Sequence, residues 1–213
     1  RIEPGAINWM TAGRGIVHSE RTPHDLAGQP HRTHGLQLWA ALPKAHEEDE
    51  PSFTHTPQAD IPVVALDGAV VKVLIGTAFG QTSPVRTYMQ TLYLDVALQA
   101  GRELRLEDLP PEAAVYPISG DVLLDGVALL PHTMALLEAG AVPVVTAGSG
   151  PVQFVVIGGE PLDGHRFLFW NFVSSSKQRL SQAADDWSAQ RMGQVPGETE
   201  FIPLPKAPLR PAT

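Results

Sequence analysis

GAINWMTAGRGIVHSE, residues 5–20, predicts a strand, a turn marked by glycines and a second strand that ends by presenting His18 and Glu20. Side chains two positions apart in a strand point to the same face, so His18 and Glu20 would stand side by side on one wall. An imidazole nitrogen beside a carboxylate oxygen is half of the ligand set that non-haem iron and similar first-row metal ions accept. A second interpretation stays open, because any exposed hairpin can carry a solvated histidine and glutamate.

The composition indicates an acidic β protein with many turns. A length of 213 residues is enough for one large all-β unit or two small domains. The 19 glycines and 20 prolines are spread along the chain, which indicates many short strands and turns. A formal net charge of −8 argues against a nucleic-acid surface, which needs a basic stripe. No apolar run approaches the ~20 residues of a membrane span, and the first residues, RIEPGAINWM, lack the blocks of a signal peptide. The lack of cysteine excludes disulfides and thiolate ligands and is neutral about the compartment. From these features together we expect a soluble, cytoplasmic protein that binds neither nucleic acid nor membrane.

Short apolar segments along the chain predict the strands of a closed β-barrel or a double-sheet sandwich. The dipeptide Asp125-Gly126 gives the strongest hairpin signal, because it tolerates the positive φ angles of a type I′ turn. Leu36 and Leu38 alternate with Gln37 and Trp39, which also predicts a strand. The predicted strands cover residues 36–39, 70–75, 92–98, 122–124, 127–129 and 152–157.

The end of the chain changes to a helical period and then becomes rich in proline. Leu180, Ala183, Ala184 and Trp187 form one amphipathic stripe, with serines 174–176 as N-cap and Gly193 as the C-terminal stop. The prolines of residues 195–211 forbid a helix there, so we expect an extended arm. Its apolar residues, Phe201, Ile202 and Leu204, should pack across a neighbouring surface, and Trp187 should be a packing anchor rather than a cofactor contact.

The other histidines of the chain are weaker candidates for metal ligands than His18. His24, His31 and His34 lie in a polar stretch, and their spacings of seven and three fit no standard zinc pattern. We expect a loop near the mouth of the site, which leaves open that one of these histidines contacts a ligand. The others are expected to be exposed or structural; they are His46, His55, His132 and His165.

Several blocks together resemble the pirin family of the cupin superfamily. They are WMTAGRGIVHSE (residues 9–20), HGLQLW (34–39), TSPVRTYMQTLYLDVAL (82–98) and GGEPLDGHRFLFWNFVSSSKQRL (158–180). They stand in the family's order, with the helix and the PGETEFIPLP tail after them, and cover nearly the whole chain. The cupin second motif is Gly, five residues, Pro, one residue, Gly and then His. Here Gly5 and Gly13 keep the spacing, Thr11 replaces the proline, and His18 follows after a longer gap, as in pirins.

The resemblance implies an all-β protein of two stacked cupin-type β-barrels, followed by a C-terminal helix and an extended arm. Residues 1–58 would be the C-terminal part of the N-terminal barrel, which is incomplete in this chain. Residues 59–175 would form a second, metal-free cupin barrel, because LPPEAAVYPISG (residues 109–120) has no histidine where a cupin places its first ligands. Residues 176–213 would be the helix and tail.

The resemblance also implies a single metal in the first barrel, held by three histidines and one glutamate. His18 and Glu20 carry over by position. The other two histidines belong to a segment upstream of this motif that the sequence does not contain, and we expect upstream residues to supply it. Fe(II) is the expected cofactor, with Mn, Ni, Cu and Zn as alternatives, and a site that is empty in this chain is a further alternative.

Three functions remain open on this reading. The first is a metal-dependent oxygenase of the quercetin 2,3-dioxygenase type acting on a small flavonol-like aromatic substrate, with Glu20 as both metal ligand and catalytic proton acceptor. The second is a non-enzymatic, metal- and redox-responsive regulatory protein that binds a partner protein. The third is a degenerate scaffold without metal. We expect a monomer in each case.

Overall fold

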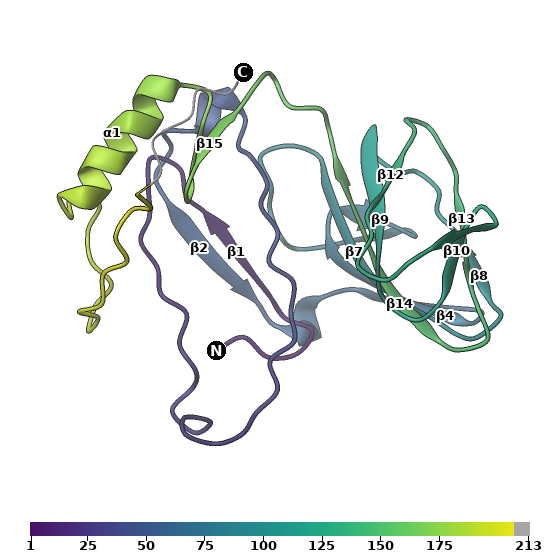
Figure 1. Ribbon diagram of the computed structural model, residues 1–213. Coiled ribbons are helices and arrows are strands. Elements are labelled where there is room, and N and C mark those ends of the chain that lie inside the picture. Colours follow the sequence, from purple (N-terminus) through teal and green to yellow (C-terminus); the bar gives the residue numbers. More distant parts are fainter. Residues whose placement is uncertain (207–213) are drawn as a thin grey trace. The chain divides into compact units, whose positions relative to one another are not determined.

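The computed structural model describes residues 1–206, which form two compact units (Figure 1). The barrel unit consists of Ile2–Trp9 and Thr54–Pro161. The helix unit consists of Arg1, Met10–Phe53 and the described residues from Leu162 to Lys206. This division rests on contacts, and the domain boundaries at residues 58 and 175 stay predictions. No helix among residues 1–206 is both long and apolar enough to cross a membrane.

Two antiparallel sheets build the barrel unit. The six-stranded sheet has the order β12 (Ala135–Leu137), β9 (Glu112–Ser119), β14 (Val152–Gly159), β7 (Thr91–Leu98), β4 (Ala69–Ile75), β3 (Val63–Leu66). The four-stranded sheet has the order β11 (Val127–Leu129), β10 (Val122–Leu124), β13 (Val144–Ala147), β8 (Glu103–Arg105). The short pair β5 (Thr77–Ala78) and β6 (Gln81–Thr82) and the 3₁₀ turn η2 (Gln58–Asp60) complete the unit.

The core of the barrel unit is apolar, as the alternation along its strands predicts. In β7 every second side chain is buried, namely Leu92, Leu94, Val96 and Leu98. Phe154 of β14 is fully buried in the same cluster, and β14 pairs with β7 on one side and β9 on the other. This interior is therefore filled by hydrocarbon side chains, whose burial stabilises the unit.

The hairpin prediction at Asp125-Gly126 is confirmed. Leu124 pairs with Val127, which leaves a two-residue connection between β10 and β11. Asp125 and Gly126 have φ angles of 49° and 79°. Two positive φ angles in a two-residue loop are the mark of a type I′ turn, whose twist matches that of the strands it joins.

The helix unit contains one α-helix among the described residues, together with short strands. The helix α1 (Lys177–Ser188) begins at Ser176, whose side chain accepts a hydrogen bond from the Arg179 N–H, so the serine N-cap is confirmed. The strands β15 (Phe167–Phe169) and β16 (Phe172–Ser174) form a hairpin, and η1 (Lys44–His46) is a 3₁₀ turn. The strands β1 (Ile7–Thr11) and β2 (Ser52–Thr56) pair with each other, and the division between the units passes through this pair.

The helix ends earlier than the sequence predicts. Its C-cap is Ala189, and Gln190 takes a left-handed conformation with φ 54°, so the stop predicted at Gly193 is wrong. The Gln190 N–H donates to the Trp187 carbonyl and the Arg191 N–H to the Asp186 carbonyl, which satisfies the last turn without a glycine. The buried stripe of Leu180, Ala183 and Ala184 agrees with the predicted one.

The extended arm lies against α1 (Figure 1), and the predicted packing of its apolar side chains is confirmed in part, because Phe201 contacts Trp187 whereas Ile202 is 61% exposed. The Trp187 indole N–H donates to the Ile202 carbonyl at 2.8 Å, and the Trp187 and Phe201 rings stack with centroids 5.3 Å apart. Trp187 is therefore a packing anchor. The part of the predicted arm after residue 206 lies outside the described residues.

The strand predicted at residues 36–39 is absent. These residues have no strand partner among residues 1–206, and Leu36, Leu38 and Trp39 are 41–57% exposed. A strand needs a neighbour for its backbone N–H and C=O groups, so an alternating pattern alone does not form one.

A buried ion pair joins two distant parts of the helix unit. The Arg166 Nε atom lies 2.7 Å from Glu47 Oε1, and their side chains are only 6% and 12% exposed. The Glu47 carboxylate also accepts hydrogen bonds from the hydroxyl groups of Ser174 and Ser175 and from the Ser175 N–H. The Arg166 Nη2 atom donates to the Leu42 carbonyl at 2.7 Å. This network fixes the segment after η1 against β16.

Candidate metal site

The turn after β1 depends on a close backbone approach. The Arg14 N–H donates to the Asp49 carbonyl at 3.0 Å, and the Gly15 N–H donates to the Ala12 carbonyl at 2.9 Å. Gly13 has φ 50°, and a Cβ atom placed on it would lie 2.0 Å from the Asp49 oxygen. Only glycine fits at this position, which explains the AGRG sequence ahead of the candidate ligands.

Substituting alanine for Gly13 is expected to lower the free energy of unfolding by about 2–3 kcal/mol, because positive φ and a backbone clash act together. Gly28→Ala is the matched control. Gly28 also has a positive φ, 75°, but no atom lies within 4 Å of its Cβ position, so about 1 kcal/mol is expected. Urea unfolding curves measure both values, and equal losses would contradict the close approach at Gly13.

The second strand predicted for residues 5–20 is not formed. After the turn, residues 15–22 have no strand partner among the described residues, whereas the first strand is present as β1. His18, Ser19 and Glu20 are all exposed. The glycine turn was predictable from local sequence, but a second strand requires a partner strand to complete its hydrogen bonds.

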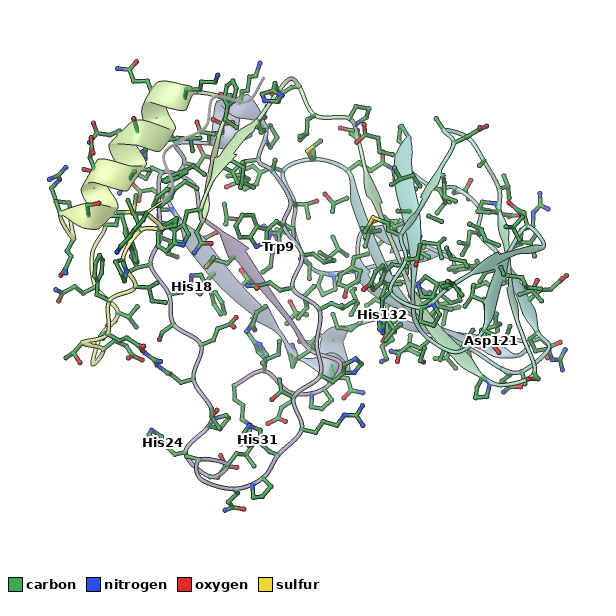
Figure 2. The ribbon with its side chains drawn as sticks, in the orientation of Figure 1. Trp9, His18, His24, His31, Asp121 and His132 are labelled. Atoms are coloured by element: carbon green, nitrogen blue, oxygen red, sulfur yellow. The ribbon has the colours of Figure 1, made fainter. Side chains whose placement is uncertain are left out.

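The imidazole of His18 and the carboxylate of Glu20 are donors that suit a divalent first-row metal. They supply only two of the four ligands that the resemblance implies. Within residues 1–206 no group of three or more His, Cys, Asp or Glu side chains could hold a metal ion. Figure 2 shows His24 and His31 at the far end of the loop that follows His18, so they do not join it. The assignment of His18 and Glu20 as metal ligands, and of Glu20 as catalytic, thus stays a prediction.

Three histidines have local partners instead. His31 Nδ1 contacts the Gln29 carbonyl, His46 Nδ1 lies 2.7 Å from Asp49, and His55 Nδ1 lies 2.7 Å from Asn8 Oδ1. His132 contacts the ring of Tyr116. Each contact is a structural use of the imidazole, and whether His31 also contacts a ligand stays open.

Sequence reasoning missed the residues that hold the segment of His18 and Glu20. Arg21 donates from Nε and Nη2 to the two carboxylate oxygens of Glu198, at 2.8 and 2.6 Å, and Ser19 Oγ donates to Glu198 at 3.1 Å. Arg21 also donates to Glu200 at 2.7 Å. The hydrogen bonds from Arg21 and Ser19 hold the pKa of the Glu198 carboxyl below its usual range, and the two glutamates raise the pKa of Arg21.

The side chains of β9 that face the core of the barrel unit are apolar. They are Ala113, Val115 and Pro117, which offer no metal ligand. A cavity of about 200 Å³ in this unit is lined by Thr77, Thr87 and Asp108, among others. The prediction that this barrel is metal-free stays a prediction.

Comparisons with known proteins find related chains over nearly the full length. The family model described as Pirin matches residues 1–40, and the one described as Pirin C-terminal cupin domain matches residues 93–193. A protein named Pirin-like protein from Caulobacter vibrioides is 42% identical over 208 residues, which are 96% of this chain and 71% of the relative. Human Pirin is 34% identical over 200 residues, 91% of this chain and 67% of the relative.

A crystal structure of quercetin 2,3-dioxygenase from Acinetobacter baumannii superposes with a TM-score of 0.88 at 31% identity. It covers 99% of this chain and 70% of that protein. The chain thus spans about two thirds of the length of these relatives. The predicted fold class, all-β with cupin-type barrels and a C-terminal helix, is confirmed.

Proposed function

Because this chain belongs to the pirin family of cupin proteins, we propose that it is a metal-dependent oxygenase of the quercetin 2,3-dioxygenase type. The substrate would be a small flavonol-like aromatic molecule. The observation that carries the proposal is the similarity to a quercetin 2,3-dioxygenase over 99% of the chain. Aerobic consumption of quercetin by the Fe(II)-reconstituted protein tests it.

His18 and Glu20 would hold the metal, with Fe(II) as the first choice and Mn, Ni, Cu or Zn as alternatives. A bound divalent metal supplies a Lewis acid that polarises a substrate oxygen. Both side chains are exposed in the described residues, so a ligand can reach them. Further donor side chains would have to complete the coordination of the metal, because residues 1–206 contain no group of three His, Cys, Asp or Glu side chains that could hold a metal ion.

Glu20 would also accept the proton of the substrate hydroxyl group. A carboxylate performs this role when one of its oxygens comes within hydrogen-bond distance of the hydroxyl group. The flanking residue Ser19 is bonded to Glu198, which keeps the backbone beside Glu20 in place. Glu20 thus has the chemistry for two tasks, binding the metal and moving the proton.

Glu20→Gln is expected to lower quercetin turnover by about a hundredfold while part of the metal is retained. The amide keeps the size of the side chain and one oxygen donor, but it is a far weaker base than a carboxylate. Rates are to be expressed per bound metal, measured by elemental analysis. Glu107→Gln, at an exposed residue of the barrel unit that pairs with Arg105, is the control and should keep full turnover. Undiminished turnover per metal in Glu20→Gln would refute the role of Glu20 as a base.

The regulatory alternative, in which the redox state of a metal alters a surface that binds a partner protein, stays a prediction. So do the monomeric state and the cytoplasmic location. Iron-loaded protein that consumes none of a panel of flavonols would favour the regulator, whereas protein that binds no metal would favour the degenerate scaffold.

A further inference from the structure

We propose that Glu198 is a positioning residue, which uses the C-terminal arm to hold the segment carrying His18 and Glu20. The inference rests on the proposed function for the role of that segment. The Glu198 carboxylate accepts three hydrogen bonds, from Ser19 Oγ at 3.1 Å and from Arg21 Nε and Nη2 at 2.8 and 2.6 Å. Two-atom pairing of arginine with a carboxylate is the most directional ion pair available to a protein.

The sequence of the arm presents Glu198 at a defined place. Val195-Pro196-Gly197-Glu198 closes a turn in which the Glu198 N–H donates to the Val195 carbonyl at 3.1 Å. Proline at the second position and a glycine with φ 80° at the third are typical of a type II turn. Further along, the bond from Trp187 to the Ile202 carbonyl anchors the arm to α1. Glu198 is thus placed by the turn that it closes and by the anchor at Ile202 that follows it in the sequence.

The segment needs such a support, because no sheet fixes it. Residues 15–22 have no strand partner in the described part of the chain. At its beginning, Arg179 of α1 donates to the Arg14 carbonyl at 2.5 Å, and the Met192 side chain lies beside Gly15. At its end, Glu198 holds Ser19 and Arg21. Elements from the C-terminal part of the chain therefore hold the segment at both ends.

The arrangement suits a metal site in two further respects. Ser19 and Arg21 bond to the same carboxylate, so the contacts that hold the segment to Glu198 use neither of the candidate ligands His18 and Glu20. Arg21 alone would place a positive charge next to Glu20 and oppose a cation. Glu198 and Glu200 both pair with Arg21, so the three side chains carry a net charge of −1.

Hydrogen exchange and cobalt binding test the proposal on the full chain. Glu198→Gln should speed the exchange of the amides of residues 16–22 by about threefold or more, because local opening becomes easier. It should also weaken Co²⁺ binding by about tenfold, the loss typical of removing a group that orients a metal ligand. Binding is measured by competition with a chromophoric chelator. Arg21→Gln should speed the exchange alike, and the double variant should exchange no faster than either single one, since the two groups act as a pair. Glu107→Gln, in the other unit, should change neither quantity.

Each failure has its own signature. Unchanged amide exchange of residues 16–22 in Glu198→Gln would contradict the claim that Glu198 holds this segment through Ser19 and Arg21. Faster exchange with equal Co²⁺ affinity in the altered and unaltered proteins would overturn the positioning role. No Co²⁺ binding by the unaltered protein would refute the proposed function itself, and the positioning role would fall with it.

Discussion

Glu47→Ala is expected to lower the free energy of unfolding of the helix unit by about 3–5 kcal/mol, because it leaves a buried arginine without its counter-charge. The side chain of Arg166 is 6% exposed, so water cannot take over from the carboxylate 2.7 Å away. The same change removes the acceptor for the Ser174 hydroxyl and for the Ser175 N–H. The donors left without this acceptor are part of the predicted loss, which Arg166 limits by keeping its contact with Asp163.

Glu48→Ala is the matched control for this prediction. Glu48 is the next residue and also pairs with an arginine, Arg179, at 2.8 Å, but its side chain is 61% exposed. The loss there should stay within about 1 kcal/mol, since solvent screens the pair. Urea unfolding followed by tryptophan fluorescence measures both, because Trp170 and Trp187 lie in the helix unit. Equal losses for the two glutamates would contradict the account of the buried pair.

Phe154→Ala is expected to lower the free energy of unfolding of the barrel unit by about 3–5 kcal/mol. Phe154 is 0% exposed and belongs to β14, a strand with neighbours on both sides in the six-stranded sheet. Its truncation exposes no new surface to water and instead leaves a cavity among residues such as Val96 and Val115, which rigid strands cannot close.

Leu136→Ala is the control for this substitution. Leu136 lies in the edge strand β12 and is 81% exposed, so its truncation should change the free energy of unfolding by no more than about 0.5 kcal/mol. Calorimetry and circular dichroism measure the shift in the melting temperature. A small loss for Phe154→Ala would mean that the core is more loosely packed than the structure shows.

Features that depend on neighbouring residues were predictable from the sequence. The alternation of Leu92 to Leu98 predicted a buried face, and Asp125-Gly126 predicted a hairpin, because both follow from local backbone geometry. Features that depend on distant partners were not. The alternating residues 36–39 and the segment after Gly15 formed no strand, because no partner strand is available among the described residues.

The candidate site shows the same division. His18 and Glu20 could be singled out from their spacing, since donor chemistry is a property of the side chains themselves. The residues that hold the segment of His18 and Glu20 could not be predicted from the sequence. Arg21 and Glu198 are 177 positions apart, and nothing in the local sequence of either indicates the other. The early helix end has a similar origin, because Gln190 adopts the left-handed conformation that the sequence assigns more readily to Gly193.

Metal content measured on purified protein, with and without His18→Ala, tests the central claim most directly. The account predicts that the unaltered protein binds about one divalent metal ion per chain once further donors join His18 and Glu20, and that almost none is bound after the substitution. Unaltered protein that stays metal-free after incubation with Fe(II), or His18→Ala protein that keeps the same metal content, would contradict it.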